Sequence, residues 1–441
     1  MLQWKRQCAW KVHMLSYYLK LALVNFKRAP SLYALVLLTL SIGVGLLSAN
    51  MALVGVMAGD PIPEKSSQLY HVSMNTWPND HNTHGEPLYI IRYRDGMMIS
   101  GSDIPKHSAL FYETSVYARD VQSTSLSRQS GKVRATTPGF FALTEAPFAY
   151  GTGFTESSGN VVVIGSEFNQ QIFGGGNSVG KEIELAGELF TVIGVLKPWN
   201  LRPKFYHATD NRAFDKTDDL YIPLESAIDQ NWRAQARTST ADSWQHMFQT
   251  RERNVYYLQA WVELDSAQSK QDFQQFLDGY SQSLKDAGEH PLAIINELNN
   301  VNEWLTKQEV VDDKILAFTI ATALFLLVCV FNASSLLLSR FHAGKFEVGL
   351  RRAIGASKIQ VLCQGLVEST LLGIITSFVA LGLSSLFLIL SVKMLPNLAN
   401  IAVLNNETLV LGALLSILTA NFSALYAIYR ANRYSISAEL K

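Results

Sequence analysis

A cluster of histidine and aspartate near residue 80 has side chains of the kind that bind metal ions. Asp80, His81 and His84 belong to the segment DHNTH, and His71 lies upstream of it. Carboxylate and imidazole groups bind zinc, but a protein site needs three or more firmly held ligands. Because no helical pattern holds these side chains on one face, we interpret the segment as a solvated polar loop and expect no metal site.

A second candidate is the segment GGNSVGK, residues 175–181, which has the GxxxxGK spacing of a phosphate-binding loop. In such a loop Ser or Thr follows the lysine and a helix comes next. Here Glu182 follows, and KEIEL alternates like a strand, so we interpret the glycines as a turn. The sequence also contains no nucleophile elbow, paired-carboxylate pattern or zincin helix. We therefore expect a non-catalytic chain without a cofactor of its own.

Four apolar segments are long enough to cross a membrane, since each exceeds the roughly 20 residues that a hydrocarbon core requires. One large insert separates the first two segments. The sequence thus predicts an α-helical membrane protein with this organisation: leader helix 1–30, span 31–57, insert 58–313, span 314–339, loop 340–361, span 362–392, loop 393–406, span 407–429 and tail 430–441.

Basic residues next to the spans predict the orientation. They are concentrated before the first span, in the 340–361 loop and after the fourth span, whereas the 393–406 loop has only Lys393. By the positive-inside rule, both termini and the 340–361 loop are cytoplasmic and the insert is outside. The leader is predicted to be an amphipathic helix on the membrane surface.

Composition agrees with a membrane part joined to a polar domain. Hydrophobic residues make up 48% of the chain and charged residues 17%, and the formal net charge is zero. Zero net charge argues against a nucleic-acid partner. The three cysteines are Cys8, Cys329 and Cys363, none of them in the insert, so disulfides are not expected to stabilise it.

The insert alternates between strand and helix patterns, which is typical of an α+β domain. Residues 181–196 indicate two strands joined at Ala186 and Gly187, and 256–264 a further strand. Residues 301–314 indicate a helix that runs as a stalk into the second span. Most of its aromatic side chains are expected in the core, although some could line a cleft for apolar cargo; they are Trp199, Tyr206, Trp232, Trp244, Tyr256, Tyr257 and Trp261.

The 340–361 loop and the span after it contain the remaining candidates. Arg351 and Arg352 stand side by side in a short helical stretch that Gly355 interrupts. Such a helix can dock in a groove on a partner, which we favour, whereas positive-inside anchoring alone would also explain its charges. Glu368, at the edge of the third span, suggests an ion pathway. Because the spans contain no other charge to relay protons, we favour a snorkelling side chain or pairing with the loop.

These same residues resemble a known family. RRAIGAS, followed by a helix ending in ESTLLG, resembles the FtsX-like permease signature of the MacB superfamily of ABC transporters. TTPGFFAL at 136–143 and the stretch 161–196 are similar to the family's periplasmic core domain. The leader from Leu19 resembles the family's start, and YRANRYSISAEL its closing motif, although Ser435 and Ser437 stand near where a proline is usual.

The resemblance implies a periplasmic domain with two lobes: a porter lobe, about 62–115 and 230–310, and a sabre lobe, about 116–229. It also implies two permease subunits, as a homo- or heterodimer, each holding an ABC ATPase that binds ATP and Mg. The residues that the resemblance places in the ATPase-coupling loop are Glu347, Arg351, Arg352, Gly355 and Ala356.

The function implied is that of a permease in the inner membrane of a didermic bacterium. Movements driven by the ATPase would cross the membrane by mechanotransmission and drive efflux of small molecules or peptides, together with a periplasmic adaptor and a TolC-like outer-membrane channel. Two alternatives remain open. One is a lipoprotein-releasing permease of the LolC/LolE kind, and the other is an FtsX-like scaffold that controls a cell-wall hydrolase.

Overall fold

The structure is a computed structural model. It describes residues 2–78, 86–123, 128–209, 212–235, 237–240, 251, 253–290, 293–311, 313–343, 345–394, 401–402 and 404–432, without the side chains of the first helix before residue 14. The chain forms two compact units. A helical unit comprises 1–57 and 311–441, and a large α+β unit comprises 58–310.

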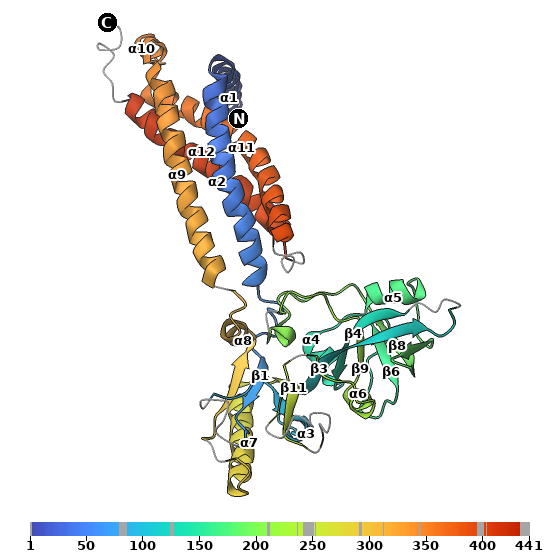
Figure 1. Cartoon of the computed structure of the whole chain (residues 1–441). Coiled ribbons are helices and arrows are strands. Elements are labelled where there is room, and N and C mark those ends of the chain that lie inside the picture. The colour runs from blue at the N-terminus through green and yellow to red at the C-terminus, as the bar shows by residue number, and fades with distance from the viewer. Residues whose placement is uncertain are drawn as a thin grey trace. The chain divides into compact units, whose positions relative to one another are not determined.

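The helical unit consists of long apolar helices. Among the described residues, four helices are long and apolar enough to cross a membrane: α2, α9, α11 and α12. In Figure 1, α2 lies against the other three, in agreement with their contacts. The bounds are α1 Leu2–Arg28, α2 Pro30–Met57, α9 Asp313–Ala343, α10 Lys345–Ala353, α11 Lys358–Met394 and α12 Asn406–Asn432.

Small residues let these helices approach closely. A Cβ atom added to Gly45 of α2 would lie 2.9 Å from the backbone oxygen of Ala380 in α11, and one on Gly373 would lie 2.8 Å from the Cα of Ile417 in α12. Ser384 also donates a hydrogen bond of 2.8 Å to the Gly45 carbonyl. Without a strong hydrophobic force between helices in lipid, close packing and interhelical hydrogen bonds of this kind hold spans together.

The large unit is built on one mixed sheet of twelve strands among its described residues. Its main order is β12-β1-β11-β3-β4-β9-β6-β8-β5, with β2 and β10 beside β11 and β7 beside β3 and β8. The pairs β4–β9 and β6–β8 are parallel, and the others are antiparallel. The strands are β1 Leu69–Met74, β2 Ile91–Arg92, β3 His107–Asp120, β4 Gln129–Thr136, β5 Phe148–Gly151, β6 Val161–Ile164, β7 Glu182–Leu185, β8 Glu188–Leu196, β9 Leu220–Pro223, β10 Ser239–Thr240, β11 Val255–Glu263 and β12 Asn296–Asn300.

The sheet has a hydrophobic core on each face because alternate strand residues point to opposite sides. Leu110 and Tyr112 of β3 belong to one core, and Ala109 and Phe111 to the other. Helices α3, α5, α6 and α7 contribute to the first core, and α4, η1 and α8 to the second. Their bounds are α3 Tyr93–Ser100, α4 Gly139–Thr144, α5 Ser166–Phe173, η1 Phe205–His207, α6 Leu224–Asp229, α7 Ala267–Asp286 and α8 Val301–Lys307.

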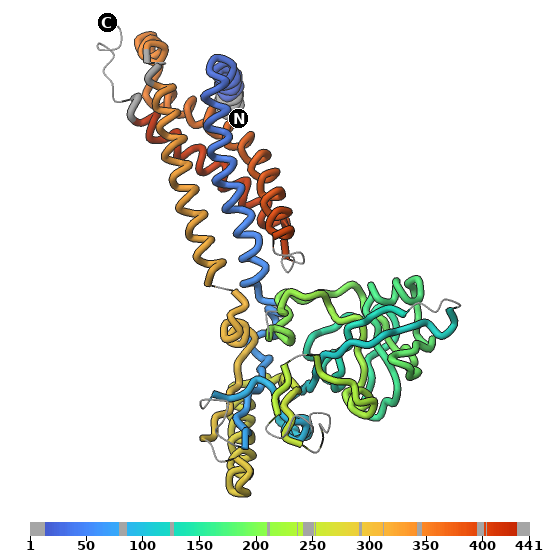
Figure 2. The backbone as a smooth tube through the Cα atoms, viewed as in Figure 1, coloured from blue at the N-terminus to red at the C-terminus, as the bar shows by residue number. Residues whose placement is uncertain are grey.

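The two ends of the large unit meet in the sheet. Figure 2 shows β1, near the start of the unit, beside β12, near its end, and the two strands pair from Tyr70 with Asn300 to Met74 with Asn296. The predicted strands at 181–196 and 256–264 are confirmed. Ala186 and Gly187 both have positive φ, 52° and 99°, and form the predicted turn between β7 and β8.

The predicted stalk helix is wrong as a continuous rod. Helix α8 ends at Lys307, and α9 begins only at Asp313. Glu309 adopts a left-handed φ of 49°, and Val310 donates a hydrogen bond back to the carbonyl of Leu305. These turn bonds satisfy the last carbonyls of α8 and end the helix.

Candidate functional site

The turn between α10 and α11 has a fixed backbone. Gly355, with a φ of 111°, donates to the carbonyl of Arg352 at 3.2 Å, and Ala356 donates to that of Arg351 at 2.9 Å. This pair of bonds is a Schellman motif, which ends a helix at a left-handed residue. Ser357 and Gln360 then bond reciprocally to each other's backbone N–H groups and cap α11. Both helix ends at this turn are therefore closed by local hydrogen bonds.

Arg351 ties α10 to its neighbours. Its guanidinium lies 3.2 Å from Glu347 and donates to Gln364 of α11 at 2.8 Å. Glu347 in turn lies 3.1 Å from Arg28 at the end of α1. These contacts join α1, α10 and α11, so Arg351 and Glu347 position the short helix within the chain.

The exposed side of α10 is apolar. Phe346 and Leu350 of α10 recur at the same spacing as Ile354, which follows directly after the helix and donates to the carbonyl of Leu350 at 3.1 Å. These three side chains are 61%, 46% and 80% exposed. Residues at this spacing lie on one helix face. We call these three residues the α10 ridge. Ile359, at the start of α11, is also exposed. The loop therefore presents an apolar ridge beside charged side chains that contact neighbouring helices.

A buried polar group lies next to the loop. Glu368 of α11 is only 8% exposed and accepts hydrogen bonds from Asn25 of α1, at 2.7 Å, and from the hydroxyl of Tyr33 in α2. Arg340 of α9 donates to Asn25 at 3.3 Å. A cavity of about 40 Å³, lined by Glu347, Arg351 and Gln364 as well as by Asn25, Arg340 and Glu368, connects this group with the contacts of α10.

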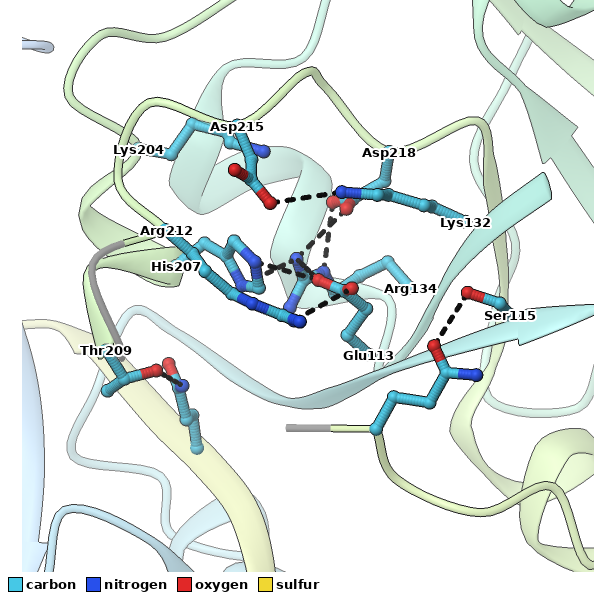
Figure 3. Close-up of polar contacts among 12 residues, drawn as sticks. Glu113, Ser115, Lys132, Arg134, Lys204, His207, Thr209, Arg212, Asp215 and Asp218 are labelled. Atoms are coloured by element: carbon cyan, nitrogen blue, oxygen red, sulfur yellow. Dashed lines mark hydrogen bonds and ion pairs between the residues drawn. The ribbon is translucent and has the colours of Figure 1, made fainter. Parts of the chain in front are cut away.

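The large unit contains a second polar cluster, between β3, β4 and the segment 204–218 (Figure 3). Arg134 donates two hydrogen bonds of 3.0 Å to Asp218 and one of 3.3 Å to Nδ1 of His207. Nε2 of His207 lies 2.8 Å from Glu113, which also accepts from Arg212 at 3.2 Å. Because Nδ1 accepts from arginine, the proton of the neutral imidazole lies on Nε2, facing the carboxylate.

The charges in this cluster are set by burial and pairing. Burial alone would raise the pKa of Glu113, but the His207 contact and the Arg134 charge hold it well below its usual range. Burial lowers the pKa of His207, and it lowers that of Lys204 to about 8. Since Arg134, Asp218, Glu113 and His207 are buried and lie against one another, we interpret the cluster as an ion-pair network that joins the segment 204–218 to the sheet.

The structure tests the phosphate-loop candidate directly and the metal candidate only in part. Asp80, His81 and His84 lie outside the described residues, and within the described part no three metal-binding side chains come together. His71 is fully buried, with its ring stacked on Trp304 at 3.6 Å between centroids. The segment 175–181 is a turn with positive φ at three of its glycines, and strand β7 follows it, as expected.

Comparison with protein families decides what kind of chain this is. A model described as MacB-like periplasmic core domain matches residues 33–279, more than half of the chain, and one described as FtsX-like permease C-terminal matches 319–436. The chain belongs to the MacB/FtsX-like family of ABC transporter permeases. Such permeases are multi-pass membrane subunits, generally non-catalytic, of transporters that have an ATPase partner.

Solved structures are also similar to the permease. The periplasmic region of MacB from Actinobacillus actinomycetemcomitans aligns at 13% identity and a TM-score of 0.36, covering 58% of this chain and 98% of that one. The extracellular domain of the noncanonic ABC-type transporter YknZ from Gram-positive bacteria aligns at 16% identity and a TM-score of 0.33, covering 53% and 100%. A comparison with curated proteins found no match.

The five loop residues predicted from the sequence of this permease lie together but differ in their surroundings. Glu347 and Arg351 make contacts within the chain, and Gly355 and Ala356 form the turn. The α10 ridge was not among the predicted residues, which were chosen for their charges and their turn, although the spacing of 346, 350 and 354 is visible in KFEVGLRRAI.

The interpretation of Glu368 requires correction. Its side chain is buried instead of snorkelling to the surface. Among the described residues, its hydrogen-bond donors are Asn25 and Tyr33 on two other helices of the permease, and not residues of the 340–361 loop. The expectation for the aromatic residues holds for Tyr206, Tyr256 and Trp261, which are buried.

Proposed function

We propose that this chain is the transmembrane subunit of an ABC transporter in a bacterial inner membrane and that a separate ATPase docks on the α10 ridge. The observation that carries the proposal is an exposed apolar ridge on a short helix whose charged residues hold it in place. Apolar anchors on a rigid helix are suited to a groove on a partner. ATP and Mg would bind to that partner.

The route of coupling follows from the contacts of α10. A force that the ATPase exerts on the ridge would be transmitted to α1 through the contact between Glu347 and Arg28. It would be transmitted to α11 through the hydrogen bond from Arg351 to Gln364. Glu368 then links α11 to α1 and α2. Rigid helices joined by such contacts would carry the movement across the membrane to the large unit, which is the mechanotransmission expected of this family.

We further propose that both termini and α10 are cytoplasmic and that the large unit is periplasmic, with efflux of small molecules or peptides as the result. The basic residues around α10 support this orientation. The sheet order supports a porter lobe from 62–115 and 230–310 and a sabre lobe from 116–229, since the ends of the unit supply β1, β2, β11 and β12. The 115/116 boundary falls inside β3. A dimeric permease, an adaptor and an outer-membrane channel complete the proposal.

To test the proposal, the tagged chain is purified from native membranes and the proteins that accompany it are identified. ATP hydrolysis is then measured in the same preparation. We expect an ABC ATPase with the wild type and at least about tenfold less of it with Leu350→Ala/Ile354→Ala. The matched control is Val410→Ala/Leu414→Ala, a similarly spaced and exposed pair on α12. Arg351→Gln should keep the ATPase but slow hydrolysis, because α10 would lose its link to α11.

Three outcomes would contradict the proposal in different ways. Equal recovery of the ATPase with the ridge variant would place docking elsewhere. Recovery of a lipoprotein chaperone or a cell-wall hydrolase, without an adaptor, would favour one of the two alternative functions. A preparation without any ATPase would refute the transporter assignment itself.

A further inference from the structure

One edge of β3 in the large unit is interrupted. On the edge opposite β4, β3 pairs with β11 through residues 107–111 and with β7 through 118–120. Residues 112–117 pair with β4 on their other side, but among the described strands none pairs with them on this one. The sheet therefore has a gap between two strands that share one edge.

Single hydrogen bonds mark the two ends of the gap. Gln235 donates to the carbonyl of Glu113 at 2.8 Å, and Ala186 donates to that of Tyr117 at 3.0 Å. Backbone groups of alternate residues point to the same edge of a strand. The N–H and C=O of Ser115 therefore point into the gap, and no described residue is seen to hydrogen-bond to either group. This is a donor and acceptor pair of the kind that an added strand uses.

A groove of about 550 Å³ covers this stretch, and its size suits a ligand, since binding pockets measure roughly 300–1,000 Å³. Tyr117, which is 63% exposed, and Trp232 supply apolar surface. The charged lining residues are Arg128 and Arg233, and the described lining includes no carboxylate. Both arginines also interact with other groups of the chain, Arg128 with Glu184 at 3.3 Å, outside the lining. The groove thus combines a strand edge, aromatic surface and positive charge.

We propose that this groove binds an extended, acidic polypeptide segment of a partner protein by strand addition at Ser115. Main-chain hydrogen bonds give such an added strand its affinity, while the side-chain surroundings select its sequence. Carboxylates are the natural counterparts of two arginines, whose forked guanidinium groups bind them at two points. The proposal does not depend on ATPase docking at α10, which lies in the other unit.

The test measures fluorescence anisotropy of labelled peptides with the full chain in nanodiscs. The probe is the hexapeptide Glu-Val-Glu-Val-Glu-Val. We expect saturable binding with a Kd below about 1 mM. Methylation of all its peptide nitrogens, which removes the N–H donors but keeps all charges, should abolish binding. The Lys-Val counterpart should not bind.

A variant pair locates the site. Arg128→Glu/Arg233→Glu should weaken binding at least about tenfold, because the groove would then repel the acidic peptide. Arg94→Glu/Lys285→Glu makes the same change of charge on α3 and α7, away from the groove lining, and should bind like the wild type. The proposal is refuted by the absence of saturable binding, by equal binding of the methylated peptide, or by equal effects of the two double variants. Unchanged tryptophan fluorescence verifies that the variants are folded.

Discussion

His71 should make the large unit sensitive to acid. Burial lowers the pKa of this imidazole to about 3, against an ordinary value near 6.5, with a smaller contribution from the charge of Lys307 and an opposing one from the backbone of Tyr89. The folded state therefore keeps His71 neutral, while the unfolded chain takes up a proton below about pH 6.5. Stability is complete above that pH and is lost progressively as the pH falls toward 3.

The magnitude follows from the two pKa values. At pH 5 the unfolded state has gained almost one proton and the folded state almost none, so linkage costs the fold about 2 kcal/mol relative to pH 8. His71→Phe keeps an aromatic ring for stacking on Trp304 but cannot titrate. The variant loses the 3.1 Å contact with Ser73, which we expect to cost about 1 kcal/mol at every pH.

Urea unfolding of the full chain in nanodiscs measures the effect. Six of the eight tryptophans lie between residues 58 and 310, so their fluorescence reports mainly on the large unit. Between pH 8 and pH 5 the wild type should lose about 2 kcal/mol more than His71→Phe, a difference in midpoint of about 1 M urea. His207 and the buried carboxylates titrate in both proteins. Only the difference between the pH dependence of the wild type and that of His71→Phe therefore reports on His71. Parallel pH profiles would refute the assignment of a neutral, deeply buried His71.

Three further predictions concern packing and backbone. Arg134→Met should destabilise the large unit by about 3–5 kcal/mol in urea unfolding, since it removes the guanidinium that binds buried Asp218 and one of the two arginines beside Glu113. Lys132→Met at a half-exposed pair should cost about 0–1 kcal/mol. Gly45→Val should lower the thermal stability of the helical unit in detergent, while Gly55→Val, which has open space around it, should not. Gly355→Val should cost about 1–3 kcal/mol in the same measurement because its φ of 111° strains any other residue.

Local patterns predicted well those parts of the fold that depend on neighbouring residues. The turn at Ala186 and Gly187 was predictable because the alternation on both sides fixes where two strands must reverse. The four apolar helices were predictable because length and lack of charge are properties of a single segment. The break after Lys307 was not predictable, since apolar residues continue at helical spacing past it and only hydrogen bonds of the turn show where the helix ends.

Contacts between segments that lie far apart in the sequence could not be predicted from such local patterns. Glu368 accepts a hydrogen bond from Asn25, which lies 343 residues away in the sequence. No pattern near either residue indicates that the two are in contact. The charged members of the candidate site were predicted through the family resemblance. Which of them contact other helices depends on how α10 packs. The docking role that we propose falls on apolar residues whose spacing, but not whose exposure, was visible in the sequence.

The contacts of Glu368 have a consequence for how the protein is made. Synthesis proceeds from the N-terminus, so α1 and α2 emerge before α11. Asn25 and Tyr33, the donors for the Glu368 carboxylate, are thus already in place when that carboxylate reaches the bilayer. A span that enters lipid with an unpartnered charge is costly to insert. A shortened chain that lacks the first 57 residues should therefore insert α11 less efficiently, even though that helix is itself unchanged.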